Sequence, residues 1–365
     1  MKVAIVGPVY PYRGGIAHFT TQLVENLKQE AHDVFVYSFK RQYPAWLYPG
    51  KTDKDTSQKV KAVEAEFLLD PLNPFSWFLT GQRAASKSPD IVVIMWWTTF
   101  WALPVAVYSG MLRKKGIKVV FIIHNVLPHE AKPWDPFLSK LALRNGRAFL
   151  TMTEKETGRL RKILPNAKIA ATPHPVYNIF ESGGITKTEA REILNLPPDE
   201  KVILFFGIIR PYKGLRHLLH ALALLRGKRD FHLVIAGEFW EPETEYVSLI
   251  HEMGIEDLVH LYGRYIPNEE VSTFFSAADI FVAPYKNGTQ SGAVKVALGF
   301  NLPTVVTQCI LDDTLAKTDT VVVSRDHEPE NLALAIEEAL NLSDKSFPKA
   351  TQSGWENLVH IIENM

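Results

Sequence analysis

Cysteine is almost absent from this chain, which has one, Cys309, among its 365 residues. A lone thiol excludes an intrachain disulfide and a CxxC metal site, so we expect a reducing compartment. Net charge is also absent, because 40 basic residues balance 40 acidic ones. A general nucleic-acid binder needs a basic excess, so we expect no nucleic-acid partner. A chain of this length predicts two domains of ordinary size.

Several catalytic and targeting motifs are missing as well. The sequence has no Walker A loop, no serine nucleophile elbow and no HExxH segment. We expect no secretory signal, because the first residues, MKVAIVG, already read as a strand. The uncharged run 91–112 is long enough to cross a bilayer but contains Thr98, Pro104 and Ser109. It divides better into a strand, a loop and a helix, so we expect no membrane span.

Strand-like and helix-like segments alternate along the chain. Such alternation is typical of parallel sheets covered by helices on both faces. Residues 173–184 interrupt it with prolines and glycines, and predict the connection between two doubly wound domains. Helices are predicted over 186–196 and 352–364, among others. The predicted strands are 3–6, 34–38, 91–96, 119–123 and 148–152 before this connection, and 202–209, 231–236, 259–262, 280–283, 304–307 and 321–323 after it.

The most informative stretch is 202–215, VILFFGIIRPYKGL. An apolar run ends at a glycine, and Arg210 and Lys213 then precede Gly214 and an amphipathic helix. Ligands of parallel sheets bind at the carboxyl ends of the strands. Two cations beside a helix N-terminus suit a diphosphate, although two surface cations flanking a turn are the alternative.

Three further loops follow predicted strands. Gly14 and Gly15 precede a helix, where they either let backbone amides approach an anion or meet a need for positive φ. Residues 124–130, HNVLPHE, suit contacts to sugar hydroxyls, proton transfer or a structural role; without a third histidine nearby, zinc is disfavoured. Residues 284–292, PYKNGTQSG, suit phosphate or sugar binding at a helix N-terminus, or ordinary N-capping by Ser291.

Aromatic residues gather in two places, at 96–101 after a strand and at 43–48, a loop that contains Pro44 and is followed by Pro49. Aromatic faces stack on sugars and also suit a membrane surface. We expect core packing for Trp96 and ligand contact for Trp97. The loop 43–48 has lysines and arginines on both sides, so it either docks on anionic lipid or is a mobile surface loop.

Together these pieces resemble the retaining glycosyltransferases of family 4. The segments FFGIIRPYKG, LVIAGE, YGRYIP and AADIFVAPY come in the family's order and spacing over nearly the whole chain. The resemblance implies an α/β fold of the GT-B type, with two Rossmann-like doubly wound parallel-sheet domains facing across a cleft. Residues 1–178 would bind the acceptor, with a C-terminal helix at about 350–365 packing back on them. Residues 179–349 would bind the nucleotide sugar.

The resemblance also implies an activity. A sugar would pass from a nucleoside-diphosphate sugar to a saccharide or lipid-linked saccharide, in bacterial surface polysaccharide or glycolipid assembly. No metal and no further cofactor would be required. The expected location is the cytoplasm or the inner face of the cell membrane, with peripheral membrane contact.

Site residues follow from the resemblance and from the loops. Arg210 and Lys213 would hold the diphosphate and stabilise the leaving group, and His124 would face the transferred sugar. Trp97, His129 and Glu130 are assigned to the acceptor. Donor contacts are expected from Gly14, Gly15, Gly207, Glu238, Tyr265, Ile266, Tyr285, Gln290, Ser291 and Gly292.

The sequence departs from the family in two places. Where the family has two glutamates eight positions apart, this chain has Gly288 and Val296, as in a subgroup with a Gln-Ser-Gly loop. The arginine lies three residues after the glycine, and Ile208 holds its usual place. Two alternatives therefore stay open: a non-catalytic nucleotide-sugar-binding partner subunit, and a GT-B-fold nucleotide-sugar epimerase.

Overall fold

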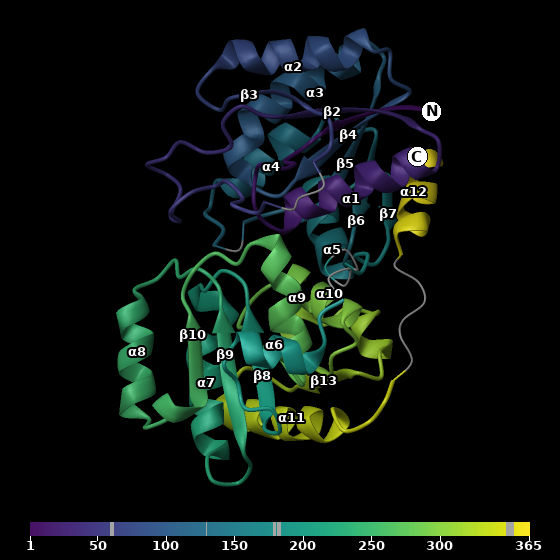
Figure 1. Ribbon diagram of the computed structural model, residues 1–365. Helices are drawn as coiled ribbons and strands as arrows, with labels where there is room; N and C mark the ends of the chain where they lie inside the picture. Colours follow the sequence, from purple (N-terminus) through teal and green to yellow (C-terminus); the bar gives the residue numbers. More distant parts are fainter. Residues whose placement is uncertain (59–61, 129, 178–179, 181–183, 348–353) are drawn as a thin grey trace. The chain divides into compact units, whose positions relative to one another are not determined.

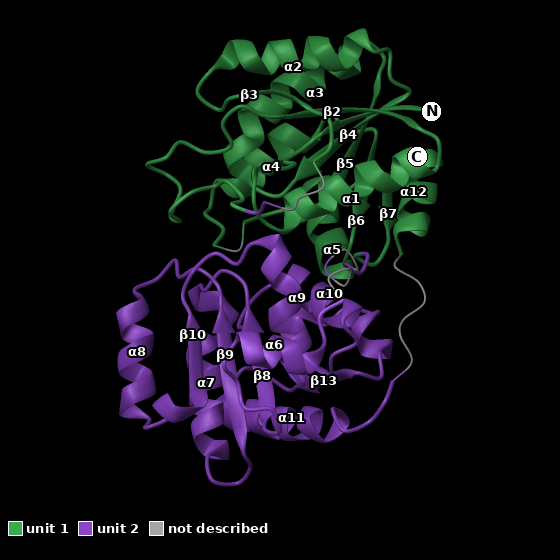
Figure 2. Cartoon of the chain, viewed as in Figure 1, with its two compact units in different colours: residues 1–56, 60–174, 354–365 green, residues 57–59, 175–353 purple. Residues whose placement is uncertain are grey.

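The computed structural model describes residues 1–58, 62–128, 130–177, 180, 184–347 and 354–365 (Figure 1). The chain divides into unit 1, residues 1–56, 60–174 and 354–365, and unit 2, residues 57–59 and 175–353 (Figure 2). The division after residue 174 lies four residues before the predicted one, at 178. Ser57 and Gln58 join unit 2 because Ser57 Oγ accepts from the backbone N–H of Asn268 and the Gln58 N–H donates to Glu269.

Unit 1 is built on a parallel sheet of seven strands in the order β3-β2-β1-β4-β5-β6-β7. The central strands are buried along nearly their whole length, which explains their continuous apolar sequence. The strands are β1 (Lys2–Val6), β2 (Asp33–Phe39), β3 (Glu66–Leu69), β4 (Ile91–Trp96), β5 (Lys118–Ile123), β6 (Ala148–Thr151) and β7 (Ile169–Ala171), and the helices are α1 (Gly15–Gln29), α2 (Pro74–Ser86), α3 (Ala102–Lys114), α4 (Asp135–Leu143), α5 (Glu154–Ile163) and α12 (Trp355–Glu363).

Helix α12 returns the end of the chain to unit 1. The Trp355 side chain is buried, and its ring centroid lies 5.2 Å from that of Phe19 on α1. Asn357 Nδ2 donates to Thr172 Oγ1 over 3.0 Å. These contacts make α12 part of the layer that covers one face of the sheet.

Unit 2 repeats the design with six parallel strands in the order β10-β9-β8-β11-β12-β13. Leucines spaced for one helix face fill the layer between the sheet and α7. The strands are β8 (Lys201–Phe206), β9 (Phe231–Ala236), β10 (Val259–Tyr262), β11 (Ile280–Ala283), β12 (Thr304–Thr307) and β13 (Val321–Ser324), and the helices are α6 (Lys187–Ile193), α7 (Leu215–Leu225), α8 (Glu243–Glu252), α9 (Asn268–Ala277), α10 (Gly292–Gly299) and α11 (Pro329–Leu342).

The strand order of each sheet reverses beside its first strand. In unit 1, β1 lies between β2 and β4, and in unit 2, β8 lies between β9 and β11. Connections leave in opposite directions at such a point and open a crevice outside the carboxyl ends of the strands. The segments after β1, β4, β8 and β11 are therefore the places where each sheet can take a ligand.

The predicted doubly wound α/β units are confirmed, with corrections at the strands. The sequence analysis missed β3 and β7, which are short and lie at the edges of their sheet. Strand β8 ends at Phe206 instead of Ile209, because Gly207 turns the backbone with a φ of 106°. The run 91–112 divides into β4 and α3, with a short 3-10 turn between them.

No helix in the described part of the chain is both long enough and apolar enough to cross a bilayer.

Candidate functional site

The turn after β8 holds Lys213 against the backbone of Gly207. Residues Pro211–Lys213 form one 3-10 turn, and Gly214 follows with a φ of 73°. A Cβ atom added to Gly207 would lie 2.9 Å from Lys213 Nζ, so a side chain there would displace the ammonium group. Within the described residues, no carboxylate forms an ion pair with Lys213. This ammonium group therefore lies at the switch point of unit 2 without a neutralising acid.

Arg210 adds a second cation to the same turn. Its guanidinium carbon lies 5.4 Å from the ring centroid of Tyr212 and 5.5 Å from that of Trp240. Burial lowers the pKa of Lys213; Tyr212 opposes this shift, and the charge of Arg210 adds to it. A bound anion would offset the repulsion between the two cations and favour the charged form of Lys213.

The loop between β11 and α10 fixes this turn from the other side of the switch point. A Cβ atom on Gly214 would lie 1.9 Å from the carbonyl oxygen of Pro284, so the two backbones approach as closely as glycine permits. The Lys286 N–H donates to the Tyr212 carbonyl oxygen over 2.7 Å. The two segments that flank the switch point thus form one connected piece.

Polar side chains of the same loop hold one another. The Tyr285 hydroxyl lies 2.9 Å from Ser291 Oγ, which also accepts from the N–H of Val294 at 3.4 Å. Ser291 is therefore the N-cap of α10, the ordinary role that the sequence left open. Burial raises the pKa of Tyr285 to about 12, so the phenol keeps its proton at neutral pH. Gln290 and Gly292 lie directly on either side of this cap.

Glu238 lies beside the cationic turn, after β9. A Cβ atom on Gly237 would lie 2.1 Å from the carbonyl oxygen of Gly207, and the Ile209 N–H donates to the Glu238 carbonyl oxygen over 2.9 Å. The Glu238 side chain is buried and accepts from Trp240 Nε1 at 3.2 Å. The ends of β8 and β9 are thereby joined, and Glu238 is held at this junction.

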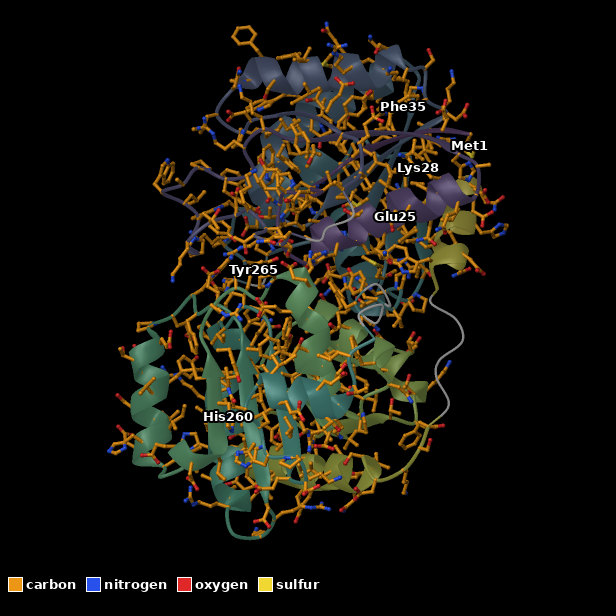
Figure 3. All side chains as sticks on the ribbon, viewed as in Figure 1. Met1, Glu25, Lys28, Phe35, His260 and Tyr265 are labelled. Carbon is orange, nitrogen blue, oxygen red and sulfur yellow. The ribbon has the colours of Figure 1, made fainter. Side chains whose placement is uncertain are left out.

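Tyr265 and Ile266 lie on the loop after β10 (Figure 3). Ile266 is buried and Tyr265 is partly exposed. Since β10 is the edge strand, two positions from β8, these residues share the carboxyl edge of the sheet but not its switch point.

The positions of the family's two glutamates are occupied by Gly288 and the buried Val296. Beside them, Lys295 is 1% exposed and donates to Asp312 Oδ2 over 3.0 Å. Asp312 Oδ1 accepts from the N–H groups of Thr314 and Leu315. The sequence analysis missed this buried pair, which anchors α10 to the segment after β12, because its members are 17 residues apart.

In unit 1, the switch point contains the turn Gly14–Gly15. Gly14 has a φ of 106° and precedes α1, and a Cβ atom on either glycine would meet no atom within 4 Å. Arg13, directly before them, is 8% exposed and donates from Nε to the Tyr48 hydroxyl over 3.0 Å. The sequence analysis missed Arg13, although a cation next to a glycine pair was a usable signal.

His124 follows β5 and is almost fully buried. Its ring lies edge-on to Phe19, with centroids 4.8 Å apart. Burial, together with a smaller contribution from the neighbouring His174, lowers the pKa of His124 to about 3. A neutral imidazole can exchange hydrogen bonds with a hydroxyl but cannot neutralise a phosphate.

The residues assigned to the acceptor fall in different surroundings. Trp97 Nε1 donates to the Tyr43 hydroxyl over 2.9 Å, so this end of the loop 43–48 is attached to unit 1. Trp46, in the same loop, is 80% exposed. Glu130 is exposed, and His129 lies outside the described residues. Trp96 is buried in the core, as the sequence predicts.

Comparison with known families decides what these two sheets represent. Residues 14–175 match the model described as "Glycosyl transferase 4-like domain", and residues 200–342 match "Glycosyl transferases group 1". The chain belongs to the group 1 glycosyltransferases. The resemblance found in the sequence is confirmed, and each sheet corresponds to one of the two matched models.

Curated relatives match parts of this group 1 glycosyltransferase. The MMP alpha-(1->4)-mannosyltransferase of Mycolicibacterium hassiacum is 32% identical over 115 residues, which are 32% of this chain and 23% of that one. The GDP-mannose:glycolipid 4-beta-D-mannosyltransferase of Xanthomonas campestris pv. campestris is 27% identical over 193 residues, 53% of this chain and 50% of that one. The chain thus spans half or less of the length of these relatives.

Solved structures confirm the GT-B fold of this group 1 glycosyltransferase. Sucrose-phosphate synthase from Thermosynechococcus elongatus superposes with a TM-score of 0.74 at 17% identity, covering 100% of this chain and 97% of that one. Anabaena Alr3699/HepE in complex with UDP superposes with a TM-score of 0.69 at 14% identity, covering 100% of both chains.

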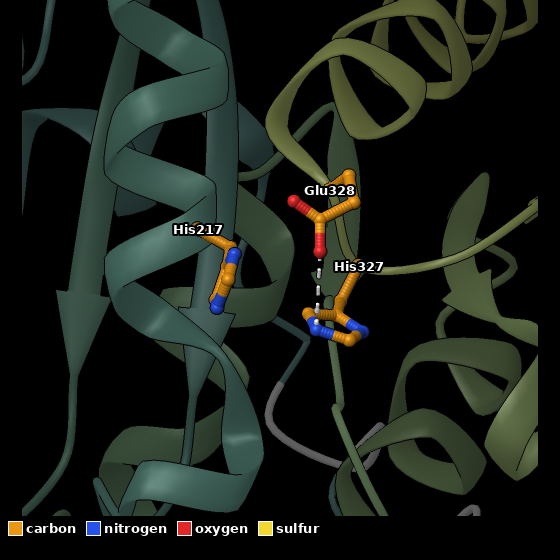
Figure 4. A group of neighbouring side chains, drawn as sticks. All are labelled: His217, His327 and Glu328. Carbon is orange, nitrogen blue, oxygen red and sulfur yellow. Dashed lines mark ion pairs between the residues drawn. The ribbon is translucent and has the colours of Figure 1, made fainter.

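One group of side chains with metal-ligand chemistry occurs among the described residues, and none of its members is assigned to the donor or the acceptor. It consists of His217 on α7 and of His327 and Glu328, which precede α11 (Figure 4). The sequence analysis considered a metal only at residues 124–130, because the members of this group are about 110 positions apart in the chain.

Proposed function

We propose that this group 1 glycosyltransferase transfers a sugar from a nucleoside-diphosphate sugar to an acceptor hydroxyl, with retention of anomeric configuration. The observation that carries the proposal is the Lys213 ammonium group held over Gly207, beside Arg210, at the switch point of unit 2. Two adjacent cations suit a diphosphate. The UDP bound by Alr3699/HepE and the GDP-mannose in the Xanthomonas name support a nucleotide-sugar donor.

The proposed reaction breaks the bond between the sugar anomeric carbon and the diphosphate oxygen, and forms a bond between that carbon and the acceptor oxygen. Negative charge then grows on the diphosphate, where Arg210 and Lys213 stabilise it. An oxygen of the leaving diphosphate accepts the proton of the acceptor hydroxyl, so the reaction requires neither a protein base nor a metal ion. Glu238, with its buried carboxylate, suits a hydroxyl of the donor, and the neutral His124 suits a hydrogen bond to a sugar hydroxyl.

A panel of UDP-, GDP- and ADP-sugars, assayed with a bacterial lipid extract as acceptor, tests this function. We expect one donor to give a glycosylated product with the donor's anomeric configuration, measured by NMR, in the presence of EDTA. Inverted product would contradict retention, and loss of transfer in EDTA would contradict metal independence. Donor binding without turnover would favour the partner subunit, and conversion of a nucleotide sugar without acceptor would favour the epimerase.

The proposed acceptor is a lipid-linked saccharide, and α2 is the proposed membrane-facing surface of unit 1. Phe75 is 83% exposed, and Phe78 and Leu79 share its helix face. Residues 71–89 contain no aspartate or glutamate, while Arg83 and Lys87 follow the apolar turns. An exposed apolar face next to cations suits the surface of an anionic bilayer. In the loop 43–48, Trp46 is the most exposed side chain and the remaining candidate for such a contact.

Sedimentation with vesicles tests the membrane contact. We expect the chain to bind vesicles that contain phosphatidylglycerol better than neutral vesicles, and a Phe75→Ser/Phe78→Ser variant to lose most of this binding. Phe137→Ser is the matched control, since it removes an exposed aromatic side chain from another helix of unit 1, α4. Equal binding by all three proteins would contradict a role for α2.

A further inference from the structure

The seam between α7 and α11 carries a cluster of metal-binding groups that the transfer reaction does not use. The potential ligand atoms of His217, His327 and Glu328 all lie within 4.8 Å of one another. The two imidazole rings meet edge to face with centroids 4.7 Å apart, and His327 Nε2 lies 3.5 Å from Glu328 Oε1 (Figure 4). Two histidines and a carboxylate are a frequent three-residue ligand set for Zn²⁺, with water in the fourth position.

The backbone that presents these groups is held from both sides. Helices α7 and α11 pack against each other through buried side chains such as Leu218 and Ile336. The turn before α11 is fixed by Asp326, whose Oδ1 accepts from the Glu328 N–H at 3.0 Å and from Asn331 Nδ2 at 2.9 Å. The Cα positions of all three ligands are therefore set by the fold before any ion binds.

The side chains have room to complete the geometry. Two atoms bound to one tetrahedral Zn²⁺ at about 2.1 Å are about 3.4 Å apart, so ligand atoms now up to 4.8 Å apart must move together by about an ångström. The Glu328 side chain is 56% exposed and that of His327 is 31% exposed, so both can rotate at low cost. Lys286 and His220 also act on His217 electrostatically, so an ion must outweigh one nearby ammonium group.

We propose that His217, His327 and Glu328 form a binding site for a divalent transition-metal ion, with Zn²⁺ as its best-matched occupant. The ion links the first turns of α7 to the start of α11 and stabilises unit 2. The proposed role of the ion is structural, because its ligands come from the first turn of α7 and the start of α11 and none of them is assigned to the donor or the acceptor. The inference is independent of the proposed sugar transfer, which needs no metal.

Zinc titration of the tag-free chain tests the site, by competition with a chromophoric chelator. We expect one saturable site and a higher midpoint of thermal unfolding in Zn²⁺. His217→Ala and His327→Ala should each weaken binding by about tenfold or more, and Glu328→Gln should also weaken it. His220→Ala is the matched control, because His220 is exposed on the same helix.

Two results would overturn the site. One is the absence of saturable binding in the unaltered chain. The other is equal zinc affinity in His217→Ala, His327→Ala and His220→Ala, which would locate the ion elsewhere. Because Glu328 is exposed, Glu328→Gln keeps the test decisive if a histidine variant folds poorly. The readout is metal binding, so its failure would leave the proposed transfer reaction untouched.

Discussion

The first turn of each sheet occupies the same topological position, but the glycines there meet opposite surroundings. In unit 2, a Cβ atom on Gly214 would overlap a backbone carbonyl group of a neighbouring loop, as would one on Gly237 after the next strand, β9. In unit 1, a Cβ atom on Gly14 or Gly15 would meet open space. Glycine in unit 2 therefore serves the packing of backbone on backbone, whereas the space beside Gly14 and Gly15 is available to a ligand.

The charged side chains beside these glycines also differ between the two units. In unit 2, Lys213 lies over a glycine with no acid paired to it in the described residues. In unit 1, Arg13 is buried beside the glycine pair and is already bonded to Tyr48. In unit 1, the glycines therefore indicate a place for a ligand better than the cation does. In unit 2, the cations indicate it better than the glycines do.

The largest effect is expected at Gly214. Alanine there adopts a left-handed conformation and places its Cβ against the Pro284 carbonyl oxygen, so Gly214→Ala should destabilise the chain by about 3 kcal/mol or more. Urea unfolding followed by tryptophan fluorescence measures this change. If the unfolding free energy of the variant lay within about 0.5 kcal/mol of that of the unaltered chain, the turn would have to move away from Pro284 at little cost. That result would contradict the tight contact between the two backbones.

The buried His124 should make the stability of unit 1 depend on pH. Its pKa is about 3 when folded and near 6.5 when unfolded, so the unfolded chain binds the additional proton between these values. The contribution of His124 to the unfolding free energy is fully present above pH 6.5. It is lost as the pH falls toward 3, at up to about 1.4 kcal/mol per pH unit.

Replacing His124 tests this dependence. His124→Asn should flatten the slope of unfolding free energy against pH between pH 4 and pH 6.5. His360→Ala, at an exposed histidine of the same unit, should leave the slope unchanged. An identical slope in His124→Asn would show that the group carries a proton in the folded state.

Lys213 should matter for rate more than for folding. Lys213→Ala removes one stabilising charge from the leaving diphosphate, and should lower kcat/KM by at least about 30-fold, or about 2 kcal/mol. Lys228→Ala, at an exposed lysine of unit 2, should leave kcat/KM unchanged. Normal turnover in Lys213→Ala would remove Lys213 from the mechanism.

The sequence predicts the buried strands of this fold better than the two edge strands of unit 1. Strands β4, β9, β11 and β12 match their predicted bounds, because burial on both faces makes each a bounded apolar run. The edge strand β10 also matches, although its four residues are only partly buried. Strands β3 and β7 have partly exposed residues and only four and three positions, so they give no comparable signal. Edge position alone does not decide the outcome, because β10 is an edge strand too and was predicted.

The candidate site shows a second limit of prediction from a single sequence. The place of Lys213 in a turn and that of Ser291 at a helix N-terminus could be predicted, because each depends on neighbours within a few positions, while their contacts to the donor stay a prediction. The Lys295–Asp312 pair and the His217 cluster depend on partners from other elements. A single sequence does not show which residues of different elements lie close together, so such groups can be recognised only in the folded structure.

The smallest change in stability is expected at Gly15, which sharpens the contrast with Gly214. Gly15 begins α1 with ordinary φ, and its added methyl group would meet no atom, so Gly15→Ala should change unfolding free energy by less than about 0.5 kcal/mol. If a substrate occupies this open space, the same methyl group should raise KM for that substrate while the unfolding midpoint stays constant. Unchanged KM for both substrates would show that the space next to Gly15 is not part of either binding site, and Gly14 alone would then serve the turn.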